Sequence, residues 1–146
     1  MPVDRIVSSV PFLIASALLM VVGLAACGRP PHLVDGPIEI TDQPITIRFD
    51  RLAASAGPIW ELCFEFDPPG DSRRAADIQA TLLAAGGARA MLRNPSLDRQ
   101  GESVVCQVGP LDVSPPGPPP GAFQGVELRS EAPLRLRGIR GGRRDR

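Results

Sequence analysis

The sequence has no tyrosine, a single histidine and only three cysteines, and each shortage narrows what the chain can do. With five phenylalanines and one tryptophan as its only aromatic residues, the core must consist mostly of Leu, Ile, Val and Ala. The single histidine, His32, lies in a segment rich in proline and glycine, where a catalytic or metal-binding role is not expected. A serine or cysteine nucleophile would therefore lack the imidazole base that activates it.

Other catalytic signatures are absent from the sequence as well. Gly86 and Gly87 are not part of a phosphate-binding or dinucleotide-binding motif. Glu61, Glu65 and Asp67 alternate along one strand, a pattern that we interpret as a solvated face rather than an acid–base pair. The sequence therefore predicts a protein that is not an enzyme, with no catalytic residue, no cofactor-binding residue and no metal ligand.

The formal net charge is zero, but the charges are divided unevenly along the chain. Residues 33–72 hold eight acidic side chains and two arginines, whereas residues 129–146 hold seven arginines and two acidic side chains. The last ten residues resemble the Arg-Gly segments that bind RNA. The first 27 residues predict export, and a domain outside the cytoplasm does not meet RNA, so we expect no nucleic-acid partner. We predict that residues 141–146 form a mobile basic tail.

The first 26 residues are typical of a secretory signal peptide. Arg5 and the terminal amine are followed by a stretch without charged residues, from Val10 to Ala26. The apolar run is short for a bilayer span, which needs about 20 residues. It ends in Leu24-Ala25-Ala26-Cys27, which resembles the lipobox of bacterial lipoproteins.

This resemblance implies that Cys27 receives diacylglycerol, that a peptidase cuts before it, and that its new amino group is acylated. Lipid chains at Cys27 would anchor the protein stably in the lipid bilayer. In lipoproteins of enterobacterial type, an Asp directly after the lipidated cysteine favours retention in the inner membrane. Gly28 occupies that position here, so the resemblance favours delivery to the outer membrane, with the domain facing the periplasm. An uncleaved transmembrane anchor, with Cys27 as an incidental thiol, is the alternative.

After the lipobox, the sequence divides into a tether, a domain and the tail. Residues 27–37 are rich in proline and glycine and predict a lipidated tether. Residues 38–140 predict one β domain, because apolar and polar residues alternate in several short segments separated by turn signals. The segments that carry this pattern are 45–50, 60–67, 103–108, 126–130 and 134–139. About seven short strands indicate a small antiparallel sandwich or barrel, immunoglobulin-like at a coarse level.

Residues 73–92 allow two interpretations. Their alanines would permit a helix over about residues 73–85, beginning near Asp71 or Ser72. Gly86-Gly87, however, separates two apolar segments in the manner of a hairpin turn. We favour two strands.

Cys63 and Cys106 remain once Cys27 is lipidated, and in an oxidising periplasm they should form a disulfide. The two residues lie in unlike surroundings, because Cys106 alternates with Val104 and Val108, whereas Cys63 alternates with Glu61 and Glu65. A bridge through the centre of a sandwich would require both cysteines to face inward. Either a bulge shifts one strand, or the bridge ties a loop or a sheet edge. The competing interpretation is that the two cysteines are reactive or metal-binding thiols. The sequence has neither a Cys-x-x-Cys motif nor a histidine near them to favour it.

Together these features predict a lipid-anchored protein of the bacterial envelope that acts as a structural or adaptor subunit, with an envelope protein as a possible partner. The alternative is a periplasmic binding module for a small ligand or glycan.

Overall fold

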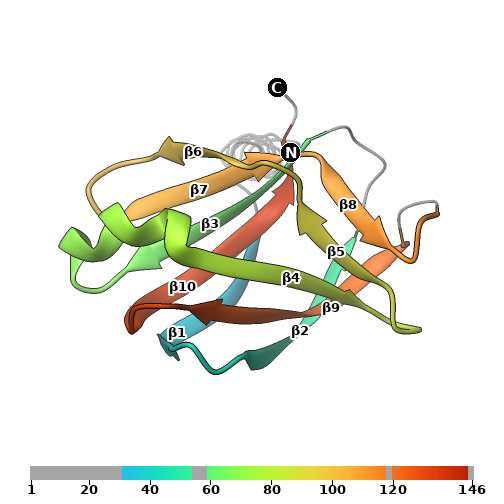
Figure 1. The fold of residues 1–146 in the computed structure, drawn as a ribbon, viewed down its shortest axis with the longest axis horizontal. Helices are drawn as coiled ribbons and strands as arrows, with labels where there is room; N and C mark the ends of the chain where they lie inside the picture. Colours follow the sequence, from blue (N-terminus) through green and yellow to red (C-terminus); the bar gives the residue numbers. More distant parts are fainter. Residues whose placement is uncertain (1–30, 54–58, 118–119, 145–146) are drawn as a thin grey trace, which may run out of the picture.

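The computed structural model describes residues 31–53, 59–117 and 120–144. These residues form two five-stranded antiparallel sheets packed face to face (Figure 1). The predicted mainly β fold is confirmed. Of the two predicted architectures, a sandwich or a barrel, the structure shows the sandwich. Within the described ranges, no helix is long and apolar enough to cross a membrane.

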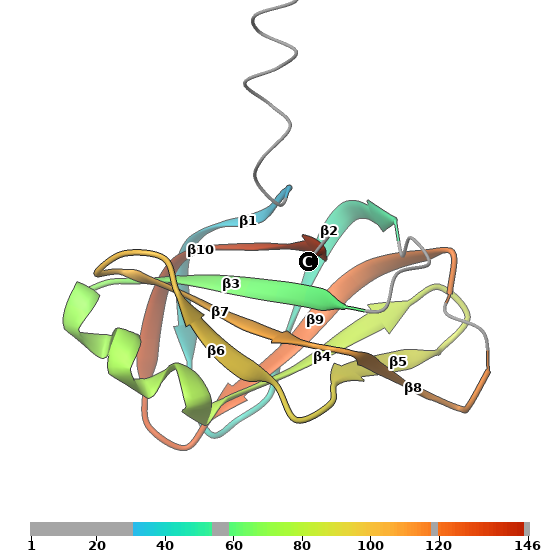
Figure 2. The ribbon, with the colours of Figure 1, turned by 90° about the horizontal axis from the view of Figure 1, so that it is seen from above.

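The first sheet, called sheet A, has the strand order β1-β10-β3-β7-β6. Strand β3 lies in its middle between β10 and β7, and β1 and β6 form its edges (Figure 2). The strands of sheet A are β1 (His32–Ile40), β3 (Trp60–Phe66), β6 (Ser96–Arg99), β7 (Val104–Gly109) and β10 (Leu134–Arg143).

The second sheet, called sheet B, has the order β2-β9-β4-β5-β8. Its strands are β2 (Ile45–Ala53), β4 (Ile78–Ala84), β5 (Arg89–Leu92), β8 (Leu111–Ser114) and β9 (Ala122–Ser130). The 3-10 helix η1 (Pro69–Asp77) leads from β3 to β4 and thus from one sheet to the other.

The strand pairing is nested, because β1 pairs with β10, β2 with β9, β3 with β7, and β4 with β5. The chain crosses repeatedly between the sheets, and this nesting is the strand order of a jelly roll, to which β6 and β8 add one edge strand each. The order refines the coarse likeness to an immunoglobulin sandwich.

The core lies between the sheets and follows the alternation of the sequence. Trp60, Leu62, Phe64 and Phe66 of β3 are all buried. The ring of Trp60 meets Phe123 of β9 edge to face, with centroids 5.5 Å apart. Such a contact adds about 0.5–1.5 kcal/mol to the burial of the two rings. The core therefore holds four of the chain's six aromatic residues where the sheets meet.

Residues 32–37, expected within the tether, belong to β1 instead. Pro37 is compatible with a strand there because β1 is an edge strand, where a missing N–H costs no sheet hydrogen bond. Gly36 lies where the pairing with β10 shifts, and a Cβ at this position would collide with the backbone of Leu136 and Arg137. The proline and glycine that predicted irregular structure therefore serve a bulged edge strand.

The basic tail predicted for residues 141–146 is also wrong in its first part, since β10 continues through Arg143. Gly141 and Gly142 are buried, and a Cβ on Gly141 would come within 2.8 Å of Leu62 Cδ2. The backbone N–H of Arg144 then donates to the carbonyl oxygen of Ile59 at 2.9 Å. The glycines thus allow β10 to pass close to the core, and charge density alone did not predict this. Residues 145–146 lie outside the described ranges.

Residues 78–92 form the predicted hairpin. β4 and β5 pair across Gly86 and Gly87, and both glycines have φ of 91°, a conformation that a glycine adopts without strain. The alternative helix over residues 73–85 is wrong, although η1 occupies the segment before β4.

Candidate functional site

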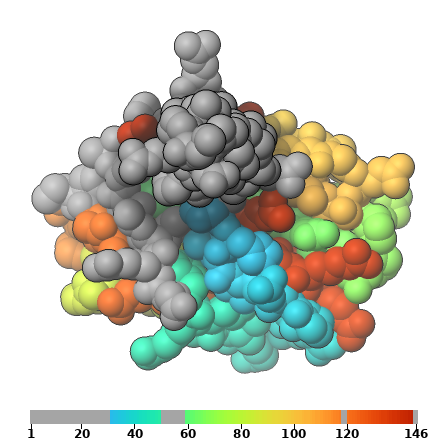
Figure 3. Space-filling model, turned by 180° about the vertical axis from the view of Figure 1, so that it is seen from behind, coloured from blue at the N-terminus to red at the C-terminus, as the bar shows by residue number. Residues whose placement is uncertain are grey.

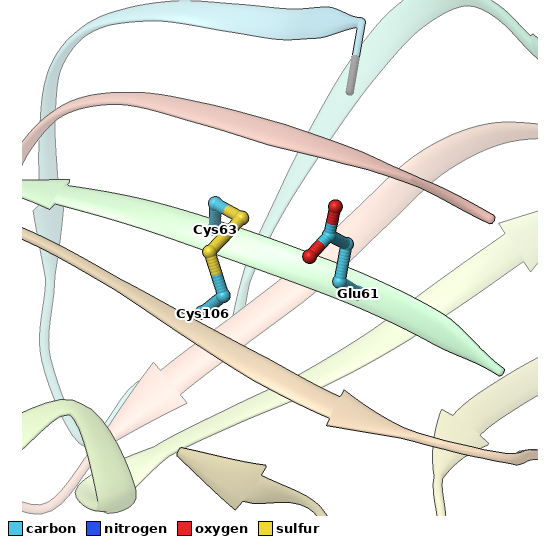
Figure 4. A group of neighbouring side chains, drawn as sticks. All are labelled: Glu61, Cys63 and Cys106. Atoms are coloured by element: carbon cyan, nitrogen blue, oxygen red, sulfur yellow. A yellow bond between two sulfur atoms is a disulfide. The ribbon is translucent and has the colours of Figure 1, made fainter. Parts of the chain in front are cut away.

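The disulfide between Cys63 and Cys106 joins neighbouring strands rather than the two sheets. The two residues are directly paired in the β3–β7 ladder, with Cα atoms 3.9 Å apart. The register is continuous from Trp60 to Glu65, so no bulge separates the cysteines. Both side chains project from the outer face of sheet A, the face turned away from sheet B (Figure 4). The predicted pairing is present, and its placement resolves the mismatch of their surroundings.

Cys106 and Cys63 differed in their predicted surroundings because the apolar neighbours of Cys106, Val104 and Val108, lie on the outer face. Val104 and Val108 are half-buried there, whereas Val105 and Gln107 point into the sandwich and are buried. Gln107 is accommodated because its amide nitrogen donates to the carbonyl oxygens of Ala75 and Ile78, each at 3.0 Å. These two hydrogen bonds offset the cost of burying an amide. One inward position of β7, that of Gln107, is therefore polar, contrary to what alternation alone predicts.

Glu61 lies beside the disulfide on the same face and is only 7% exposed. The interpretation of Glu61 as part of a solvated face is thus wrong for this residue, although Glu65 is half-buried. The guanidinium of Arg144 lies 3.8 Å from the Glu61 carboxylate and 2.8 Å from that of Asp98 on β6. One arginine from the end of the chain therefore bridges two acidic side chains from different strands.

Burial raises the pKa of the Glu61 carboxyl above its ordinary value, because the charged form loses hydration. The positive charge of Arg144 opposes this rise, and the negative charge of Asp98 adds to it. Glu61 is consequently easier to protonate in the folded chain than in water.

The other positions of this face come from β1 and β10. Arg140 is the register partner of Cys63 on β10, and His32 is the register partner of Arg140 on β1. The ring Nε2 of His32 contacts the carboxylate of Asp35 on the same strand. The outer face of sheet A thus carries a row of residues that runs His32, Arg140, Cys63, Cys106, Asp98 from edge to edge.

Two side chains of this row, Cys63 and Cys106, lie close enough to Glu61 for the three to share one ion. A carboxylate oxygen of Glu61 and the sulfur atoms of Cys63 and Cys106 all lie within 4.8 Å of one another. The sequence did not predict this group, because its residues come from two strands and the pairing register was unknown. We define it as the Cys-Cys-Glu cluster.

Cys27, the predicted lipidation site, and the signal peptide predicted over residues 1–26 lie outside the described residues. The chain matches no protein-family model, no curated protein and no solved structure.

Proposed function

We propose that the protein is a lipid-anchored lipoprotein of the bacterial envelope that acts as a non-enzymatic structural or adaptor subunit. The observation that carries the proposal is the sequence Leu24-Ala25-Ala26-Cys27 at the end of an uncharged apolar run. A β sandwich with a disulfide is compatible with an oxidising compartment, where such bonds persist.

The start of β1 supports a close attachment to the membrane. Five Cα-to-Cα steps separate Cys27 from His32, and a fully extended chain covers about 3.5 Å per step, or roughly 18 Å in all. The N–H of Gly141 donates to the carbonyl oxygen of Pro31 at 3.2 Å, so the end of β10 lies beside the start of β1. Under this proposal, the end of sheet A that carries Arg140 and Arg144 stays near the lipid headgroups. Helix η1 follows the opposite end of β3 (Figure 1).

The residues that most often perform nucleophilic catalysis are engaged elsewhere. Cys63 and Cys106 are bonded to each other, and His32 contacts Asp35 on its own strand. While the disulfide is intact, neither Cys63 nor Cys106 is available as a free thiol nucleophile. Figure 3 shows the molecule from behind, where β1 (blue) and β2 (cyan) lie at the surface and part of β10 (red) lies next to β1.

Replacement of Cys27 by Ala tests the anchor directly. We expect Cys27→Ala to lose all incorporation of labelled palmitate and to accumulate as the uncleaved precursor, because the thiol is the lipid acceptor. Cys63→Ala is the matched control and should be labelled like the unmodified chain. Labelling that persists in Cys27→Ala would refute the lipoprotein proposal.

The adaptor role is tested by crosslinking the full chain in living cells and identifying the products by mass spectrometry. A protein of the envelope that is captured by the unmodified chain, and lost when Cys27 is replaced, supports an adaptor at the membrane. Recovery of the uncrosslinked monomer alone, at crosslinker levels that trap known envelope complexes, contradicts it.

A further inference from the structure

The Cys-Cys-Glu cluster contains two sulfur atoms and one carboxylate, which are donors found in metal sites. In the oxidised chain the two sulfur atoms are bonded to each other as a disulfide. Its three ligand atoms lie within 4.8 Å of one another, and all three residues are buried. The pairing register places them there, because Cys63 lies directly opposite Cys106 and Glu61 occupies the next outward position of β3 (Figure 4). The pairing of the two strands therefore brings the three ligand residues together, and reduction frees the two bonded sulfur atoms to separate around an ion.

The chemistry of the ligands selects the class of ion. Two thiolates and one carboxylate suit a soft or borderline divalent cation such as Zn²⁺, with one coordination position left for water or another ligand. Hard cations such as Mg²⁺ and Ca²⁺ prefer all-oxygen sites and do not match this set.

The surrounding charges are compatible with a bound ion. Two thiolates and the Glu61 carboxylate carry three negative charges, and a divalent cation leaves one. Arg144, 3.8 Å from the Glu61 carboxylate, is balanced by Asp98 at 2.8 Å, so the remaining negative charge is left for Arg140 to offset. Arg140 occupies the position opposite Cys63 on the same face. The bound state therefore leaves no large uncompensated charge in a buried position.

We propose that Cys63, Cys106 and Glu61 form a Zn²⁺-class metal site when the disulfide is reduced, so that one pair of cysteines alternates between a covalent staple and a metal centre. Reduction requires a dithiol: its two thiols become a disulfide, and the two electrons and two protons pass to the sulfur atoms of Cys63 and Cys106. Binding of the cation then releases the two thiol protons. Because both cysteines are buried, the dithiol acts on the chain before the sandwich closes or when the four-residue edge strand β6 opens.

The test uses the full chain in detergent with Cys27→Ser as the background, so that Cys63 and Cys106 are the only thiols. The protein is unfolded, reduced and refolded without oxygen, and then titrated with Co²⁺, whose bonds to thiolate sulfur give a charge-transfer absorption. We expect one Co²⁺ per chain and its displacement by Zn²⁺, which binds such sites more tightly. The oxidised chain should show no such absorption.

Three further variants in the same background separate the site from nonspecific binding. Cys63→Ser should lose most of the charge-transfer absorption. Glu61→Gln should weaken binding at least about tenfold, the lower end of the loss seen even for residues that only support a ligand. Glu65→Gln is the matched control, since Glu65 lies on the same face about 13 Å from Glu61 along β3 and is not part of the cluster. It should bind within twofold of the background chain.

Absence of the sulfur-to-cobalt absorption in the reduced chain would overturn the proposal, as would equal binding by Glu61→Gln and Glu65→Gln. Circular dichroism follows folding in the same samples. If the reduced chain is unfolded without metal, recovery of the strand signal at one Zn²⁺ per chain supports the site, and failure to recover it refutes the site. Since the background lacks Cys27, the outcome is independent of whether the chain is lipidated.

Discussion

Reduction of the bond between Cys63 and Cys106 should lower the stability of the sandwich by about 4 kcal/mol. The bridge closes a loop with a sequence separation of 43 residues. The chain-entropy model assigns the denatured state a loss of about 13 cal/mol/K for a loop of this length, which is about 4 kcal/mol at 25 °C. The strands β3 and β7 remain paired in the reduced chain through their backbone ladder, so the native state loses little besides the covalent bond.

Thermal and urea unfolding of the full chain in detergent, oxidised and reduced, measure this difference without any substitution. We expect the midpoint temperature to fall by about 15 °C, because a domain of this size loses about 4 °C per kcal/mol. Metal is removed with a chelator, so that the proposed ion does not restore stability. A Cys63→Ala/Cys106→Ala chain controls for effects of the reductant and should give one transition under both conditions. Oxidised and reduced chains that unfold within about 1 kcal/mol of each other would refute the loop-entropy argument.

Three other changes test the core, the end of β10 and the buried carboxyl. Phe123→Ala should destabilise the fold by about 3–5 kcal/mol in urea unfolding. Met91→Ala, at a 47% exposed position, should change the free energy of unfolding by less than about 0.5 kcal/mol. Equal effects of the two substitutions would contradict the placement of the core. Ending the chain after Arg140 should cost about 2–4 kcal/mol, because several backbone hydrogen bonds of about 1 kcal/mol each are lost, and unchanged unfolding would show that the last residues are dispensable. In the oxidised chain, the raised pKa of Glu61 stabilises the fold. This contribution is fully present at pH values below the ordinary pKa of 4.5 and is lost as the pH rises through the pKa of the folded state. Glu61→Gln should therefore gain stability relative to the unmodified chain between pH 4 and pH 7, and a difference that stays constant with pH would contradict the shift.

The sequence predicted the fold class because alternation along a strand is a local signal. Leu134 and Leu136 are buried and Arg135 and Arg137 are exposed, as the pattern of that segment required. The strands that were missed are β1, β6 and β8. β1 contains Gly36 and Pro37, and the other two have only four residues each, too few to show a period. Their strand conformation depends on partners supplied by the rest of the chain.

The site was predictable only in part, for the same physical reason. The number of cysteines and the expected compartment predicted that Cys63 and Cys106 pair, without information on where they lie. The position of Glu61 beside them depends on the register of β3 against β7, and its contact with Arg144 depends on the full length of β10. A register is fixed by packing of the whole sandwich, and no short segment encodes it.

The nested pairing also determines when the protein can fold during its synthesis. β10 is the last strand to be made, yet it lies between β1 and β3, and β1 is the first strand of the sandwich. Until β10 has been synthesised, β1 lacks its hydrogen-bonding partner, and sheet A is divided. Loops that span nearly the whole domain must close before these contacts form, and such long-range pairing is slow. A chain that ends before β10 therefore cannot complete sheet A, and the sandwich closes only after β10 has been made.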